Sequence, residues 1–206
     1  MTTSQPDTLN PRGTAQLFDI DQFVADCRTA LAEPGSKSIK DVVARAVADP
    51  ASILRTLGEP SQASAAVLFR APDLTVLNIV WGFRQWTLPH NHNHRAIIGM
   101  YAGAEDNIFW RRLPQDAKGR VEAAGAESLR QGNVAVLGRD IIHSVTNPLS
   151  KLSMALHVYD GDFMADTKRS HWDAESLAEA PYDGAVVSPM FRQDLATPPQ
   201  TRLTNA

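Results

Sequence analysis

The sequence has little cysteine: Cys27 is the only one among 206 residues. A lone cysteine excludes an internal disulfide bond and suits a reducing compartment, so we expect a cytoplasmic protein. Cys27 falls at the apolar spacing of a predicted helix. That position favours a small buried side chain over a reactive thiol.

The sequence also lacks long apolar runs and a strong excess of charge. No run approaches the ~20 residues needed to span a bilayer, and the polar residues 1–7 contain no hydrophobic segment of a secretory signal. The net charge of -3 gives no reason to expect binding to nucleic acid or to an anionic membrane. We therefore expect a small-molecule ligand, no nucleic acid, no membrane, and a monomer or homodimer.

Apolar residues recur at helical spacing in the first third of the chain. They predict helices over 19–31, 38–47 and 50–57. After residue 64 the pattern changes to short apolar runs separated by Gly, Pro, Asn and Asp, which are typical of strands. The predicted strands span 66–69, 74–81, 96–101, 107–112, 133–137, 142–146 and 152–159. Many short strands with closely spaced turns favour a sandwich or a barrel.

These patterns divide a single structural domain into three parts. A leader and N-terminal helices occupy 1–64, a barrel occupies 65–165, and a less regular C-terminal extension occupies 166–206. A short helix is expected around 174–180. We also predict that the segment 181–192 packs over the barrel mouth, because Met190 and Phe191 supply apolar anchors after a turn.

Three of the six histidines lie within five residues, at His90, His92 and His94. Side chains at i and i+2 of a strand point to the same face, so His90 and His92 would present two imidazoles side by side. His94 would lie ~13 Å from the first position on a straight strand, so we place it at the rim. A third imidazole from a neighbouring strand, His143, would complete a facial metal site. Imidazole suits several transition metals, so the spacing alone does not name the metal.

Two stretches resemble the sequence motifs of the cupins. Gly132, His143 and Asn147 fall at the spacing of the second motif, G-x5-P-x-G-x2-H-x3-N. His90 and His92 fit the H-x-H of the first motif. The resemblance implies a mainly β fold, the cupin double-stranded β-helix or jelly-roll barrel, with an N-terminal helical cap and an irregular C-terminal extension. The glutamate position of the first motif is Ala96, which leaves three neutral histidine donors.

Within the cupins, the three-histidine pattern is similar to the thiol dioxygenases, the cysteine dioxygenase family. Trp81-Gly82 ahead of His90 resembles the entry to the histidines in that family, and the segment 98–105 looks like its 3-mercaptopropionate dioxygenase branch. The resemblance covers roughly residues 66–165. It implies Fe(II) held by His90, His92 and His143, and oxidation of a small thiol of the cysteine or 3-mercaptopropionate type by dioxygen to a sulfinate.

The family's S-x-H-x-Y row beside the iron is partly present. His157 and Tyr159 match, and by resemblance Tyr159, oriented by His157, would donate a hydrogen bond to oxygen or substrate. The serine position is Ala155. Ser153 would lie about 7 Å further along the strand, too far to replace the missing hydroxyl directly.

A thiol dioxygenase must also hold the carboxylate of its substrate, and arginine fits two carboxylate oxygens with its planar fork. Arg70 is our candidate, because it precedes the strand 74–81 much as the family's carboxylate-binding arginine precedes its strand. Arg84 and Arg95, on either side of the histidine run, are competitors. His171 is expected to be structural.

Two other functions stay open at this stage. Three-histidine cupins also cleave a carbon–carbon bond in diketones, and such a pocket would be apolar with no arginine facing the metal. Other cupins bind metal without catalysis, and a fold does not imply a function.

Overall fold

The computed structural model describes residues 17–188 as four helices and eleven strands. The helices are α1 (Ile20–Leu31), α2 (Lys37–Val47), α3 (Pro50–Leu57) and α4 (Gly184–Val187). The strands are β1 (Ser64–Ala71), β2 (Leu74–Trp81), β3 (His90–Asn91), β4 (Ala96–Ala102), β5 (Ala104–Arg112), β6 (Val121–Arg130), β7 (Val134–Leu137), β8 (Ile142–Thr146), β9 (Ser153–Tyr159), β10 (Ser170–Trp172) and β11 (Glu179–Pro181). No helix in this range is long and apolar enough to cross a membrane.

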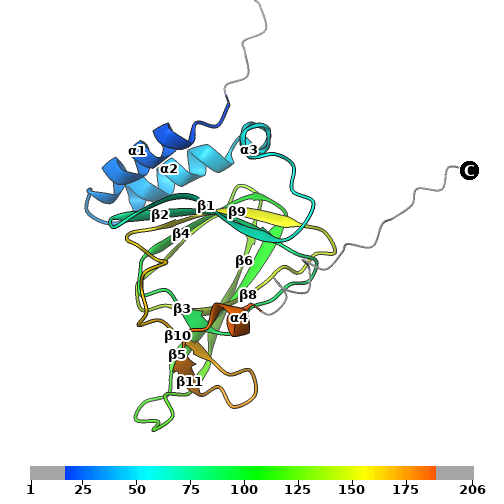
Figure 1. The fold of residues 1–206 in the computed structure, drawn as a ribbon. Helices are drawn as coiled ribbons and strands as arrows, with labels where there is room; N and C mark the ends of the chain where they lie inside the picture. The colour runs from blue at the N-terminus through cyan, green and yellow to red at the C-terminus, as the bar shows by residue number, and fades with distance from the viewer. Residues whose placement is uncertain (1–16, 189–206) are drawn as a thin grey trace, which may run out of the picture.

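The strands form two sheets that enclose the interior (Figure 1). The first sheet has the order β1-β2-β9-β4-β7, the second the order β11-β10-β3-β8-β5-β6, and all neighbours are antiparallel. From β2 to β10 the chain passes back and forth between the two sheets, with β5 and β6 as the one consecutive pair in the same sheet. This winding is that of a double-stranded β-helix, so the predicted mainly β jelly-roll fold is confirmed.

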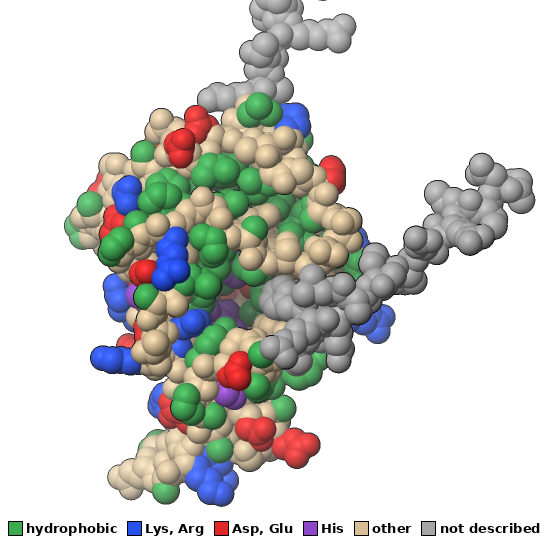
Figure 2. All heavy atoms as spheres, viewed as in Figure 1, with side chains coloured by type: hydrophobic (Ala, Val, Ile, Leu, Met, Phe, Trp, Pro, Cys, Tyr) green, Lys and Arg blue, Asp and Glu red, His purple; other side chains and the backbone are tan. Residues whose placement is uncertain are grey.

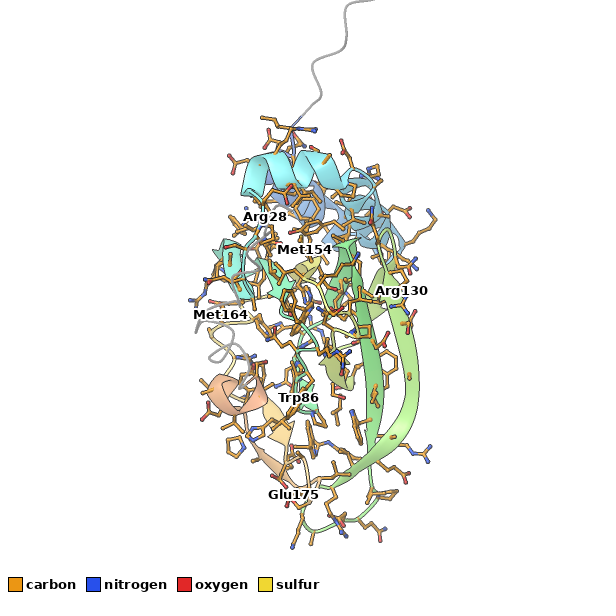
Figure 3. All side chains as sticks on the ribbon, turned by 90° about the vertical axis from the view of Figure 1, so that its right-hand side faces the viewer. Arg28, Trp86, Arg130, Met154, Met164 and Glu175 are labelled. Carbon is orange, nitrogen blue, oxygen red and sulfur yellow. The ribbon has the colours of Figure 1, made fainter. Side chains whose placement is uncertain are left out.

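The central strands of the first sheet are buried on both faces, which explains their continuous apolar runs. In β2, Leu74 and Val76 pack with the helices, whereas Leu77 and Ile79 face the interior between the sheets. Alternate residues of β4 and β9 divide in the same way, and Met154 of β9 lies beneath the helices (Figure 3). Every residue of β2 is therefore buried, as expected for a strand that is covered on both faces.

The N-terminal helices form the cap over this sheet. Asp19 caps α1 by accepting a hydrogen bond from the Gln22 amide, and Asp49 caps α3 in the same way, followed by Pro50 at the first helical position. Cys27 lies on the buried face of α1 and is fully buried, which raises the pKa of its thiol to about 12. The cysteine is thus a packing residue, as predicted.

Two features differ from the sequence-based expectation. The sequence patterns predict no strand between 112 and 133, where the structure has β6 (Val121–Arg130), a mostly exposed segment rich in Ala and Glu. It forms because it pairs along its length with β5, a tertiary interaction that overrides weak strand propensity. The C-terminal extension is also more regular than expected: β10 pairs with β3, and the segment 174–180 forms a turn and the start of β11 instead of a helix.

The cap and the first sheet meet most closely at Gly99. A Cβ atom at this position would overlap the branched side chains of Val43 and Val47 on α2. We expect Gly99→Ala to lower the free energy of unfolding by about 1–3 kcal/mol, because the helix must shift to make room. Urea unfolding checks this. Gly125→Ala on β6 is the matched control, since nothing lies within 4 Å of its added Cβ. Equal stability of both variants would contradict the close helix–sheet contact.

Candidate metal centre

Strand pairing brings the two halves of the histidine pattern together. His90 on β3 and His143 on β8 are direct partners in the antiparallel register. The strand β3 is only two residues long, and His92 follows it immediately. Asn93 then adopts a left-handed backbone conformation with φ of 56°, which turns the chain away. His90, His92 and His143 therefore converge, and His94 leaves the row.

The three imidazoles form a compact cluster. The Nε2 atom of His92 lies 3.3 Å from Nε2 of His90 and 3.2 Å from Nε2 of His143. All three potential ligand atoms lie within 4.8 Å of one another, and all three residues are buried. Nitrogen donors about 2.1 Å from a shared ion, at angles of about 90–110°, are separated by about 3.0–3.4 Å. The spacing of the cluster thus fits coordination of one ion.

Neighbouring groups set the tautomers of two of these rings. His90 Nδ1 lies 2.9 Å from the Leu88 carbonyl oxygen, and His143 Nδ1 lies 2.7 Å from Asn107 Oδ1. Both partners are acceptors, so each Nδ1 carries the proton and donates it, which leaves each Nε2 lone pair free. A carbonyl or amide acceptor behind a histidine ligand is the usual way in which proteins orient it toward a metal.

Burial keeps the cluster uncharged. Desolvation lowers the pKa of His90 to about 4 and holds the pKa values of His92 and His143 well below the usual range. Neutral imidazole is the form that binds metals. The carboxylate expected at position 96 in most metal cupins is absent here, because this residue is the buried Ala96 of β4. The site therefore consists of three neutral nitrogen donors.

The cluster opens into a cavity of about 300 Å³ between the two sheets. Figure 2 shows histidine side chains inside this hollow. Most of its wall is apolar, formed by Leu77, Ile79, Trp81, Val145, Phe163, Met164 and Val187. Besides the three histidines, the polar residues that line the cavity are Thr87, His157, Tyr159, Arg169, Tyr182 and Ser188. The size and the apolar lining suit a small molecule.

His157 and Tyr159 lie together on β9, as the sequence predicted, and both line the cavity. His157 Nδ1 lies 3.2 Å from the Tyr159 hydroxyl. Burial lowers the pKa of His157 to about 3 and raises the pKa of Tyr159 well above its usual range, so both are neutral near pH 7. The Tyr159 ring stacks on Phe163 at 4.1 Å between centroids and meets the edge of His92 at 5.2 Å.

The structure places Arg70 outside the cavity. Arg70 lies on β1, about half exposed, and donates to both oxygens of Asp162 at 2.8 and 3.1 Å. Its partner is therefore a carboxylate of the protein. Of the competitors, Arg95 bonds to the Gly35 carbonyl, and neither it nor Arg84 lines the cavity.

Arg169 is the arginine that lines the cavity, and sequence reasoning missed it. Its guanidinium lies between the rings of Phe163 and Tyr182, 4.1 and 4.0 Å from their centroids. Nε donates to the Asp166 carbonyl oxygen, while Nη1 is buried with no hydrogen-bond partner among residues 17–188. No sequence signal marks Arg169, because it reaches the cavity through the pairing of the adjacent strand Ser170–Trp172 (β10) with the histidine strand β3.

The remaining predicted residues fall around the site. His94 is only 15% exposed and lies 3.8 Å from Asp160 and 3.6 Å from Asp166, outside the cluster. His171 is buried on β10, where its backbone pairs with that of His90. From the segment expected to cover the barrel mouth, Tyr182 and Val187 line the cavity. The proposed anchors at 190 and 191 lie outside the described residues.

Replacing Asn107 tests how the cluster is oriented. We expect Asn107→Leu to weaken Zn²⁺ binding about 10–100-fold, because His143 loses the acceptor that holds its Nδ1 proton. Titration calorimetry measures this, with His94→Gln as the control for a histidine near the site that is not in the cluster. Equal affinity of Asn107→Leu and wild type would show that this hydrogen bond does not orient His143.

The buried neutral state of His157 predicts how stability depends on pH. Its pKa of about 3 in the folded protein lies below the ordinary value of 6.5, so the unfolded state binds the extra proton between these values. Stability is therefore lost as the pH falls below 6.5. Between pH 7 and 5, metal-free wild type should lose about 2 kcal/mol more than His157→Gln in urea unfolding. An equal loss in both would contradict neutral burial of His157.

Comparisons with known proteins find only distant structural likenesses. No protein-family model and no curated protein matches the chain. Among solved structures, a cupin family protein with a double-stranded β-helix fold from Methanocaldococcus jannaschii is 11% identical, with a TM-score of 0.41 over 52% of this chain and 87% of that one. Oxalate decarboxylase from Bacillus subtilis is 17% identical, with a TM-score of 0.39 over 48% of this chain.

The chain matches only 24% of the length of that oxalate decarboxylase. A conserved protein of unknown function from Streptococcus pyogenes is 14% identical, with a TM-score of 0.39 over 50% of this chain and 77% of that one. The jelly-roll assignment follows from the strand order itself, independently of these distant likenesses. The winding of the strands is that of a double-stranded β-helix barrel, and the three-histidine cluster could hold a metal ion.

Proposed function

We propose that the protein is an iron(II)-dependent dioxygenase that converts a small thiol bearing a carboxylate into a sulfinate. The observation that carries the proposal is the composition of one cavity: three neutral histidines, a histidine–tyrosine pair and a buried arginine with an unpaired nitrogen. A thiol and one dioxygen give a sulfinic acid with every atom retained. The thiol supplies the electrons, so no other reductant is consumed.

His90, His92 and His143 would hold the ion through Nε2. A bound Fe(II) would supply the redox chemistry by which dioxygen reaches sulfur. Three neutral donors leave the positive charge of such an ion uncompensated by the protein. An anionic thiolate is the substrate group that this charge favours, which supports a thiol over a neutral ligand.

Arg169 would bind the substrate carboxylate. Stacking between Phe163 and Tyr182 holds its guanidinium in place, and the bond from Nε to the Asp166 carbonyl fixes the plane of the group. Nη1 is then the buried, unpaired nitrogen that can donate to a carboxylate. A charge-assisted hydrogen bond to a carboxylate is strong in such surroundings. Preformed placement also reduces the entropy that binding costs.

The apolar wall and Tyr159 would complete the pocket. Leu77, Ile79 and Val145 exclude water from the reacting atoms. Tyr159 is held by stacking on Phe163 and by His157, so its hydroxyl is a fixed hydrogen-bonding group beside the histidine cluster. A cavity of about 300 Å³ lies at the small end of ligand sites, which favours a substrate no larger than a short thiol acid.

A second candidate is cleavage of a carbon–carbon bond in a diketone. The predominantly apolar lining of the cavity favours it. The buried Arg169 favours a carboxylate instead, because a carbonyl oxygen of a neutral diketone can pair with the guanidinium nitrogen but cannot offset its charge. A metal-binding protein without catalysis would need neither Arg169 nor the pair of His157 and Tyr159.

Dioxygen consumption separates these functions. Iron(II)-loaded protein is tested in parallel with cysteine, 3-mercaptopropionate, cysteamine, mercaptosuccinate and acetylacetone. We expect uptake with a carboxylate-bearing thiol, formation of its sulfinate, and loss of both in His143→Ala. Uptake with acetylacetone alone would establish the diketone function. Tight metal binding with no uptake from any compound would refute the dioxygenase proposal.

The two arginines supply a matched pair of variants. We expect Arg169→Gln to raise the KM for 3-mercaptopropionate at least about 10-fold, because the carboxylate loses a charged hydrogen bond worth about 1.5–3 kcal/mol. Cysteamine lacks the carboxylate, so any turnover of it should change little. Arg70→Gln removes an arginine whose charge is already paired with Asp162 outside the cavity. The reverse pattern would return the substrate carboxylate to Arg70.

A further inference from the structure

His157 has a nitrogen whose partner is missing. Its Nδ1 faces Tyr159, but its Nε2 is buried and has no hydrogen-bond partner among residues 17–188. The serine expected two residues earlier is Ala155. Ser153 is occupied elsewhere, since its Oγ donates to Asn147 and accepts from the Ala104 amide. No hydroxyl among these residues is left to pair with His157.

Glu105 is the polar side chain that faces this nitrogen. Glu105 lies on β5, is fully buried, and its Oε2 is 3.9 Å from His157 Nε2. The same Oε2 accepts a hydrogen bond from Trp81 Nε1 at 2.8 Å, and Oε1 accepts one from Asn107 Nδ2 at 3.0 Å. Each carboxylate oxygen has two lone pairs, so Oε2 has capacity for a second donor. A relative movement of about 1 Å brings the two atoms to hydrogen-bonding distance.

We propose that Glu105 is a positioning residue that replaces the missing serine: it accepts a hydrogen bond from the N–H at His157 Nε2 and thereby fixes the tautomer of His157. A neutral imidazole has one N–H, so Nδ1 is then an acceptor and accepts a hydrogen bond from the Tyr159 hydroxyl. The effect on catalysis rests on the proposed function. The tautomer itself does not.

This arrangement has a consequence for substrate choice. With its proton turned toward His157, Tyr159 presents only lone pairs to the cavity. The Tyr159 oxygen can therefore accept a hydrogen bond from a ligand, whereas the Arg169 guanidinium can donate one. The cavity therefore favours a thiol acid that also carries a donor, such as an amino group. The direction of the Tyr159 hydrogen bond is the reverse of that expected from the family resemblance.

The Glu105 carboxylate is also linked to the histidine cluster through Asn107. Asn107 donates to Glu105 through Nδ2 and accepts from His143 through Oδ1. Because the amide is held at both ends, its orientation cannot invert without losing one of the bonds. Glu105 thus determines the tautomer of His143 through Asn107, as well as that of His157. Burial raises the pKa of Glu105 to about 7, so pH 8 favours the acceptor form.

The closing experiment reads the tautomer in the metal-free protein at pH 8. Imidazole ¹⁵N NMR with His157 assigned by its loss in His157→Gln should show a protonated Nε2 and a bare Nδ1 in wild type. The exposed Glu127 of β6 supplies the control, Glu127→Gln, which should match wild type. In Glu105→Ala the Nδ1–H form should become the major one. A wild-type ring protonated at Nδ1 would overturn the proposal even if Glu105→Ala does not fold.

Turnover gives a second, separate readout. We expect kcat to fall about 10-fold in Glu105→Ala with a smaller change in KM. Restoring the hydroxyl in the double variant Glu105→Ala with Ala155→Ser should recover part of this loss, which a purely structural defect would not allow. Turnover in wild type with an unchanged tautomer in Glu105→Ala refutes only the role of Glu105. The predicted tautomer without any dioxygen uptake refutes only the proposed function.

Discussion

Three uncharged imidazoles that face one another inside a buried cavity are the constraint on which the rest of the structure depends. Their free nitrogen lone pairs repel, and burial prevents relief by protonation. The protein holds them together by hydrogen bonds: from His90 to the Leu88 carbonyl, from His143 to Asn107, and between the paired strands β3 and β8. These hydrogen bonds hold the three Nε2 lone pairs in an arrangement that favours the binding of a cation between them.

The helical cap contributes to this rigidity from a distance. It covers the outer face of the first sheet, so that β2, β4 and β9 are buried on both sides. His157 and Tyr159 project from β9 at the centre of that sheet, between β2 and β4. Their positions are fixed by packing from above and by the stacked Phe163 from below. The cap therefore supports the site although none of its residues lines the cavity.

The sequence predicted those parts of the fold and the site that local pattern determines. The H-x-H spacing and the second motif pointed to His90, His92 and His143, and the structure brings these three together. Strand 74–81 and strand 142–146 were predicted with their observed bounds, because their apolar runs end at clear turns. The edge strand β6 was missed because its residues carry little strand preference of their own.

The residues that complete the site depended on pairing between distant segments. Arg169 reaches the cavity because β10 adds to the edge of the second sheet, and nothing in a single sequence shows that register. Glu105 approaches His157 across the interior, from a strand in the opposite sheet. Resemblance to a family motif suggested an arginine and a serine near the histidines. It could not show that Arg70 pairs with Asp162.

Because β10 pairs with β3, one part of the chain carries the histidine cluster and a later part lines the rest of the cavity. The strands β3 and β8 supply His90 and His143, whereas the segment after β9 supplies Phe163, Arg169, Tyr182 and Val187 to the cavity lining. Leu88, two residues before the first histidine, donates its amide proton to the Val187 carbonyl and holds this segment closed. Substitutions in the later segment can therefore alter which small molecule fits while the nitrogen cluster stays intact. The ligand preference of such a barrel can therefore change through substitutions in the segment after β9 alone.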